Sequence, residues 1–153
     1  MGQAMTEVRF YHLENRPLDS VLPKMLQLGF ERGWRVVVQA GSPERAESLS
    51  QLLWTLGEES FLPHGSAADG MAELQPIWLT GTSENPNGAG VRFYVDGAVA
   101  GDVSGLDRAV IVFDGGDADA VARAREDWKR FRQQGCEVSY WQQDAGGRWQ
   151  NRA

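Results

Sequence analysis

Two stretches of the chain show the same order: an unbroken apolar run, a short turn and then an amphipathic segment. Residues 34–40 read WRVVVQA and precede SPERAESLSQLLWTL, whereas residues 106–116 read LDRAVIVFDGG and precede a second amphipathic segment. An apolar run without polar alternation is typical of a strand covered on both faces, and helices usually connect such strands in parallel. We therefore predict a single three-layer α/β domain with a mainly parallel, mixed sheet.

Capping residues indicate where the two helices begin and end. Ser42, followed by Pro43, has the sequence of a helix N-terminus, and Asp117 or Asp119 can cap the second helix. Gly135 stands just past the last helical position, where helices commonly end. The remaining predicted elements are strands over residues 6–13, 76–80, 91–97 and 137–144, a helix over 17–32 and a tail over 146–153.

Length and composition favour one domain. The chain has 153 residues, 42% of them hydrophobic, and no linker or repeat divides it. We expect residues 5–153 to fold together and residues 1–4, ahead of Met5, to be a tag or an N-terminal extension. The single cysteine, Cys136, fits a cytoplasmic protein without internal disulfides, and we expect no contact with a membrane.

Motifs of common catalytic and cofactor sites do not occur in this sequence. The turn after the first predicted strand reads HLENRPLD and has no glycine that would let a phosphate approach the backbone. There is no G-x-S-x-G elbow, and we expect the two histidines, His12 and His64, to have packing and loop-capping roles. Asp114, Asp117 and Asp119 resemble half of a calcium loop, but helix capping explains them better. We expect no catalytic residue, metal or cofactor.

The segment ARAREDWKRFRQQG, residues 122–135, is basic although the whole chain has a net charge of −6. On a helix over 119–134, Arg125, Lys129 and Arg132 follow one another along one flank, and Trp128 lies at the border of the apolar side. A solvated amphipathic helix explains such a pattern in many proteins. The alternative is a site for an acidic peptide that ends in an apolar residue and a free carboxylate.

Tryptophan is abundant, and several tryptophans fall outside the predicted core runs. The chain has 6 tryptophans, and Trp54, Trp141 and Trp149 belong to a helix end, a strand and the tail. The segment LLWTLGEESFLPH also brings Phe61 and Pro63 to the loop after Trp54. Because large aromatic side chains are favoured interface anchors, this segment is either a docking patch or a lid over the core.

Several segments occur in an order that resembles a known family. The segments are VRFYHL, LLWTLGEESFLPH with its W-x6-F-x-P-H spacing, QPIWLT, VIVFDG, AREDWK and VSYWQQDAGGRW. Together they are similar to the chi subunit of bacterial DNA polymerase III holoenzyme, an accessory part of the clamp-loader complex, over nearly the whole chain. The resemblance implies a Rossmann-like α/β fold without catalytic activity of its own. It also implies two partners, the psi subunit and the acidic C-terminal tail of single-stranded-DNA-binding protein, with DNA contacted only indirectly.

The resemblance assigns residues to both binding sites. The tail-binding site would contain Arg125, Trp128, Lys129, Arg132 and Asp114. The site for psi, or for an equivalent clamp-loader partner, would contain Trp54, Phe61, Pro63 and His64. Trp128 stands where relatives have tyrosine, which keeps an aromatic wall but changes its polar group, and residues 83–105 have no counterpart in the family pattern.

Two other functions would use the same basic helix. A small α/β enzyme or binding module could hold an anionic ligand between Arg125 and Lys129. Direct binding of single-stranded DNA would require a positive groove longer than one helix supplies. An acidic chain repels a nucleic-acid backbone over most of its surface, so the acidic tail fits better than DNA.

Overall fold

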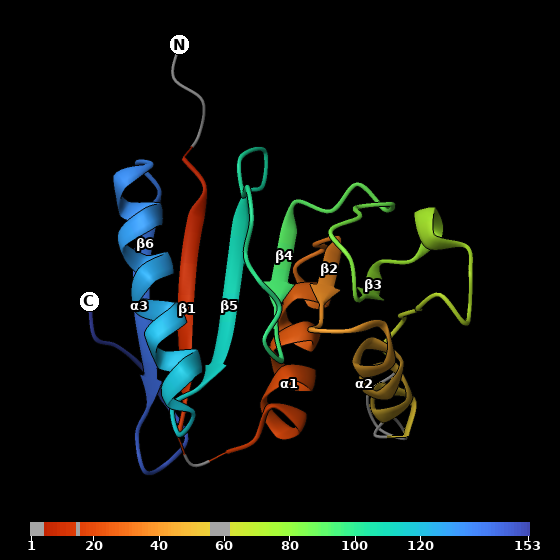
Figure 1. Cartoon of the computed structure of the whole chain (residues 1–153). Coiled ribbons are helices and arrows are strands. Elements are labelled where there is room, and N and C mark those ends of the chain that lie inside the picture. The colour runs from red at the N-terminus through yellow and green to blue at the C-terminus, as the bar shows by residue number, and fades with distance from the viewer. Residues whose placement is uncertain (1–4, 15, 56–61) are drawn as a thin grey trace.

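The computed structural model describes residues 5–14, 16–55 and 62–153, which form an α/β domain (Figure 1). The elements follow in the order β1 (Glu7–Leu13), α1 (Leu18–Glu31), β2 (Val36–Gln39), α2 (Pro43–Thr55), the 3₁₀ helix η1 (Ala72–Leu74), β3 (Ile77–Thr80), β4 (Val91–Tyr94), β5 (Arg108–Asp114), α3 (Ala118–Gln133), β6 (Glu137–Gln143) and β7 (Trp149–Asn151). The predicted α/β class is confirmed.

The strands of the described residues form one sheet in the order β3-β2-β4-β5-β1-β6-β7. Every neighbouring pair is parallel except β6 and β7, which run antiparallel with Gln142 opposite Gln150. β1 lies inside the sheet between β5 and β6, and it pairs with both over most of its length. The prediction of a mainly parallel, mixed sheet is therefore confirmed.

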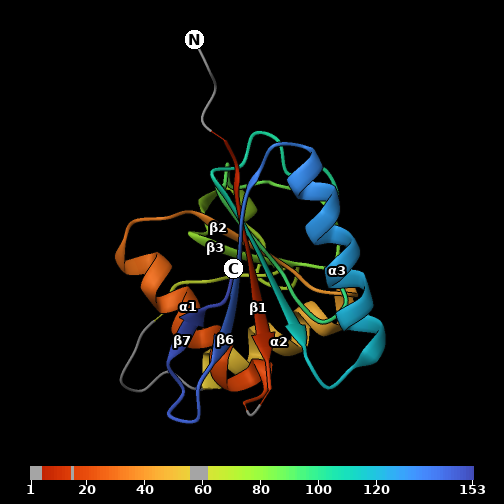
Figure 2. The same ribbon diagram turned by 90° about the vertical axis from the view of Figure 1, so that its left-hand side faces the viewer.

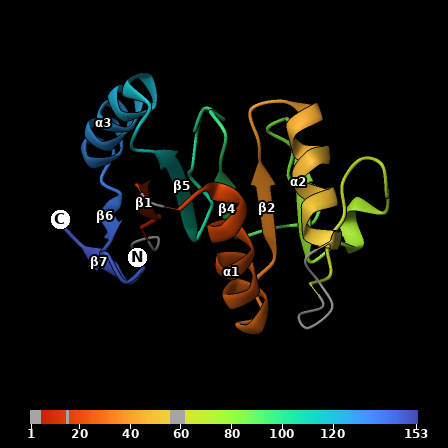
Figure 3. The same cartoon turned by 90° about the horizontal axis from the view of Figure 1, so that it is seen from below.

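Helices cover both faces of the sheet. α1 and α2 pack on one face, where Leu26 and Leu49 share a core with β2, β3 and β4. α3 packs on the other face, where Phe131 and Ala124 share a second core with Phe10 of β1. Figure 2 shows α1 and α3 on opposite sides of the sheet, and Figure 3 shows α2 and α3 at its opposite ends. The unbroken apolar strands require this arrangement because both of their faces must be removed from water.

Residues 83–105 contribute to the layer on the α3 side at the β2 and β3 end of the sheet. Ala89 packs there against Val37 and Trp78. The Asn87 side chain donates to two backbone carbonyls at 3.1 and 2.9 Å, and the buried Arg92 guanidinium donates to side-chain and backbone oxygens. These hydrogen bonds hold a segment that adds no helix against the sheet, although Asn87 Oδ1 is buried without a partner among the described residues.

The end of the chain differs from the prediction. The tail predicted over residues 146–153 contains β7, which extends the sheet beyond β6. A tight turn joins the two strands, with the Asp144 amide donating to the Arg148 carbonyl at 2.8 Å. β7 has 3 residues, and Trp149 is its single apolar residue. Its sequence therefore has no alternating pattern that would predict a strand.

Trp141 and Trp149 cover a part of β1 that lies beyond the main packing of α1. Both indoles are half-buried, and both pack on Tyr11, with ring centroids 6.1 and 4.8 Å from its ring. The Arg9 guanidinium lies 5.1 Å from the Trp141 ring centroid. The sequence analysis placed these tryptophans outside the core. In the structure they cover the α1 face of the sheet near its β6 and β7 end.

The helix ends follow the predicted capping chemistry. The Arg45 amide donates to Ser42 Oγ at 3.1 Å, and Asp117 accepts from two amides in the first turn of α3. Gly135 follows α3 with φ +84°, the left-handed conformation that favours glycine. Among the described residues, no helix combines the length and the apolar character needed to cross a membrane.

Candidate protein-binding surfaces

The basic side chains of α3 divide between two flanks of the helix. Arg123 and Arg130 lie on the flank that faces the loop after β4. Arg123 donates to the Gly97 carbonyl at 3.2 Å, and Arg130 donates to the Ala100 carbonyl at 2.7 Å. Arg130 also pairs with Asp127 at 3.1 Å. These two arginines anchor a loop, and Arg130 also has an acidic partner.

The other flank carries Arg125, Lys129 and Arg132, which we call the basic flank. All three residues are exposed. Within the described part of the chain, its only ion pair joins Lys129 to Glu126 at 3.9 Å, with side chains 70% and 77% exposed. An ion pair so open to water contributes little to stability. The positive charge of the basic flank is therefore available to a partner.

Trp128 belongs to a group of rings that we call the aromatic cluster: Phe10, His12, Phe113, Trp128 and Tyr140. The Trp128 ring lies 5.7 Å from Phe10 and 6.1 Å from Tyr140, measured between centroids. His12 and Phe113 pack in turn on Tyr140 at 5.8 and 6.1 Å. Trp128 is half-buried, so one part of the indole is fixed by packing while the rest meets solvent. A rigid aromatic surface thus lies beside the basic flank.

Tyr140 supplies a polar group next to the Trp128 indole. Its hydroxyl makes a hydrogen bond with His12 Nδ1. Burial raises the pKa of the Tyr140 phenol, the Glu14 carboxylate raises it further, and Arg125 lowers it. Arg125 precedes Trp128 by three positions on α3, so the two side chains lie on neighbouring turns of one side of the helix. The surface therefore combines an indole, a neutral phenol and a guanidinium.

The sequence did not identify Tyr140 as a member of this surface and gave His12 only a packing role. Both residues lie on the α3 face of neighbouring parallel strands, with Phe10 paired to Tyr140. The period-2 alternation of each strand was readable from the sequence. The pairing of β1 with β6, which are more than 100 residues apart, was not, because it depends on the order of strands in the sheet.

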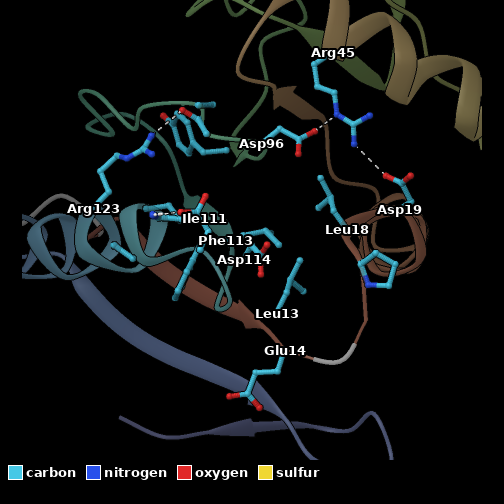
Figure 4. A pocket seen from close by; sticks show the side chains of 18 of the residues that line it. Leu13, Glu14, Leu18, Asp19, Arg45, Asp96, Ile111, Phe113, Asp114 and Arg123 are labelled. Carbon is cyan, nitrogen blue, oxygen red and sulfur yellow. Dashed lines mark hydrogen bonds and ion pairs between the residues drawn. The ribbon is translucent and has the colours of Figure 1, made fainter.

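Asp114 lies at the carboxyl end of β5 and not on α3. It lines a cleft of about 660 Å³ at the carboxyl ends of β1, β4 and β5 (Figure 4). Its Oδ1 accepts the Gly116 amide at 2.8 Å, so the carboxylate holds the turn into α3. The α3 residues of the cleft are Ala120, Arg123, Ala124 and Asp127, and none of them belongs to the basic flank. The structure thus brings Arg125, Trp128, Lys129 and Arg132 together without Asp114.

The cleft lies where β1 leads to α1 on one face and β5 leads to α3 on the other, a common ligand position in α/β folds. Its charges are largely paired: Arg45 binds both Asp96 and Asp19, the latter at 3.2 Å. The Asp96 hydrogen bond raises the pKa of the Arg45 guanidinium. More carboxylates than guanidiniums line the cleft, so it suits an anionic ligand poorly. The described residues hold no group of three or more histidine, cysteine, aspartate or glutamate side chains suited to a metal ion.

A second candidate surface lies at the end of α2. Trp54 is 44% exposed, and its ring packs on His64 with centroids 4.0 Å apart and the ring planes tilted by 35°. His64 itself is 2% exposed, and its two ring nitrogens lie 2.7 and 3.0 Å from the carbonyl oxygens of Leu62 and Ser50. The predicted loop-capping role of His64 agrees with these contacts. His64 therefore supports an indole that presents its outer face to solvent.

The neighbours of this second surface lie along the edge of the sheet. Pro63 is half-buried, and Gly65 pairs in parallel with Trp78 of β3. Phe61, which the sequence also assigned to this site, lies outside the described residues. The Trp54 surface is thus at the β3 end of the sheet, and the basic flank is at the β6 end.

The comparisons with known proteins identify the family. The family model described as "DNA polymerase III chi subunit, HolC" matches residues 5–139. The chain belongs to the DNA polymerase III chi subunit family. A curated relative, "Probable DNA polymerase III subunit chi" of Rickettsia prowazekii (strain Madrid E), is 29% identical over 87 residues, which are 57% of this chain and 53% of the relative. The chain thus spans about half the length of this relative. The family predicted from the sequence motifs is confirmed.

Proposed function

We propose that the chain is a non-catalytic adaptor of the polymerase III clamp-loader complex that binds the acidic C-terminal tail of single-stranded-DNA-binding protein. The observation that carries this proposal is the basic flank beside Trp128. In the described residues, Arg125 and Arg132 take part in no ion pair, although the chain is acidic overall. An exposed cationic row next to a fixed aromatic surface fits a peptide that is acidic and ends in an apolar residue.

Each part of the proposed ligand has a chemical counterpart on this surface. Carboxylates of the tail would bind the guanidiniums and the ammonium of the basic flank, and Arg can bind a carboxylate through two parallel hydrogen bonds. The terminal apolar side chain would pack against Trp128 and Tyr140. Affinity on the order of micromolar, about −8 kcal/mol, would suffice because an oligomeric binding protein presents several tails at once.

The Trp54 surface would then bind the psi subunit or an equivalent clamp-loader partner. Trp54 and Pro63 are apolar residues at the edge of the domain, and the buried His64 ring packs against the inner face of the indole. Tryptophan is enriched among the residues that contribute most to the binding energy of interfaces. Because the two surfaces lie at opposite ends of the sheet, both partners could bind together.

Titration with a synthetic tail peptide of the cognate single-stranded-DNA-binding protein tests the proposal. We expect the wild type to bind, and Arg125→Ala to weaken binding about tenfold through loss of a charge-assisted contact. Arg123→Ala is the matched control, because this substitution removes the same charge from the other flank of α3, where Arg123 binds the Gly97 carbonyl. It should change the affinity less than twofold. Absence of binding by the wild type at low salt would contradict the tail-binding role.

A further inference from the structure

The end of the chain runs next to Tyr140, the phenol of the aromatic cluster. The Arg152 amide donates to the Tyr140 carbonyl at 2.7 Å, directly after β7. Opposed residues of an antiparallel pair have Cβ atoms about 5 Å apart and share one face of the sheet. Arg152 therefore lies beside Tyr140 at the outer edge of the sheet, and Figure 3 shows the C-terminal end at the same end of the sheet as β6 and β7.

The pairing of β6 with β7 also fixes the face on which Arg152 lies. Trp141 and Trp149 pack in the core on the α1 side, whereas Tyr140 packs in the core under α3. Side chains alternate along a strand, so Gln150 and Arg152 belong to the α3 face. In the described structure no residue of β7 joins the α3 core. The α3 face of β7 is thus an open strip next to the aromatic cluster.

The charges of this strip leave Arg152 free for a partner. Arg152 is exposed, and no ion pair involves it within the described residues. The carboxylates on the same side have other partners: Glu14 lies 3.5 Å from His12 Nε2 and accepts from the Gln142 amide at 2.9 Å, and Asp144 accepts backbone amides of its own turn. The exposed Arg152 side chain, which strand alternation assigns to the face of the aromatic cluster, therefore has no ion-pair partner among the described residues.

We propose that β7 forms the second wall of the tail-binding surface and that Arg152 is its fourth cationic contact. This inference rests on the proposed function. An extended acidic peptide would lie between the basic flank and β7, over Trp128 and Tyr140. Arg152 would bind a carboxylate side chain of the tail from the side opposite Arg125. The tail is thus clamped between cations from two elements that only the sheet brings together.

The experiment compares Arg152 variants with matched controls in titrations of the tail peptide at low salt. We expect Arg152→Ala to weaken binding by about three- to tenfold and Arg152→Lys to retain most of the affinity. Arg148→Ala removes the same charge four positions earlier, next to the Asp144 carboxylate, and should change the affinity less than twofold. A peptide whose aspartates are replaced by asparagine should bind wild type and Arg152→Ala equally weakly.

The outcomes separate this inference from the function on which it rests. If the wild type does not bind the peptide, the proposed function fails and the inference with it. If Arg125→Ala weakens binding and Arg152→Ala does not, the second wall alone is rejected. Equal losses in Arg152→Ala and Arg148→Ala would indicate a general charge effect and would also reject it. Urea midpoints equal to the wild type would show that each variant is folded.

Discussion

The two candidate surfaces of this domain differ in what holds them together. The basic flank is a row of exposed cations on a helix, and its aromatic neighbours come from β1, β5 and β6. The Trp54 surface is a single exposed indole packed on a buried histidine whose ring nitrogens lie 2.7 and 3.0 Å from two backbone carbonyl oxygens. The first surface depends on charge and the second on buried packing. Changes in salt or side-chain charge should therefore affect the first surface, and changes in the core beneath Trp54 should affect the second.

The largest expected effect comes from removing the support of Trp54. His64→Ala leaves a cavity under the indole and removes the imidazole hydrogen bond to a buried carbonyl, so we expect a loss of about 3 kcal/mol in the free energy of unfolding. Urea denaturation measures this loss. Tail-peptide affinity of the folded fraction should stay within twofold of the wild type. A matching loss of tail affinity would show that the two surfaces are not independent.

A smaller effect is expected beneath the basic flank. A Cβ at Gly115 would lie 1.8 Å from His12 Nε2, so Gly115→Ala must displace the histidine that bonds to Tyr140. We expect about 2 kcal/mol of destabilisation and a several-fold loss of tail affinity. Gly116→Ala is the control at the neighbouring position. The nearest atom to its Cβ would be Asp114 Oδ1 at 3.3 Å, so we expect this variant to lose less than about 0.5 kcal/mol in the free energy of unfolding. Equal stability of the two variants would contradict the role of His12.

Ionic strength should separate the two surfaces without any substitution. The basic flank is exposed, so salt screens its charges. Raising the salt concentration from about 0.05 to 0.5 M should lower the affinity for the tail peptide roughly tenfold, close to 1.4 kcal/mol. Binding of a psi subunit at the Trp54 surface should change less than about threefold, because apolar burial is not screened. Calorimetric titrations of both partners at the two salt concentrations provide the measurement. Equal salt dependence would remove the distinction between the surfaces.

The smallest expected effect concerns acid stability on the β1 side of the domain. Burial opposes ionisation of Glu7, but the hydrogen bonds and charges of Arg9 and Arg108 outweigh it and lower the pKa of this carboxyl. A carboxyl with a lowered folded pKa stabilises the domain above its unfolded pKa, and this contribution is lost as pH falls below about 4.5 toward the folded pKa. Glu7→Gln should flatten this part of the curve of stability against pH. If Glu7→Gln leaves the acid transition unchanged, other carboxyl groups and not Glu7 cause that transition.

The local sequence pattern predicted most of the secondary structure. The apolar runs at β2 and β5, Ser42 at the start of α2 and Gly135 after α3 are read from neighbouring residues, because capping and burial act within a few positions. β7 escaped prediction because its pairing with β6, and not its own residues, makes it a strand. The family resemblance likewise depended on segments that each fold locally.

What the sequence determined by itself about this protein is the α/β class and the basic row of α3, whereas the structure decided that Trp54 is exposed. What only the tertiary structure decided is the neighbourhood of each. The parallel pairing of β1 with β5 and β6 brings His12 and Tyr140 to Trp128, and the anchoring of Arg123 and Arg130 leaves the other flank free. Helical spacing is fixed by bonds between near neighbours in the chain. Strand order and side-chain partners are fixed by contacts between residues far apart in it, and a local pattern does not contain that information.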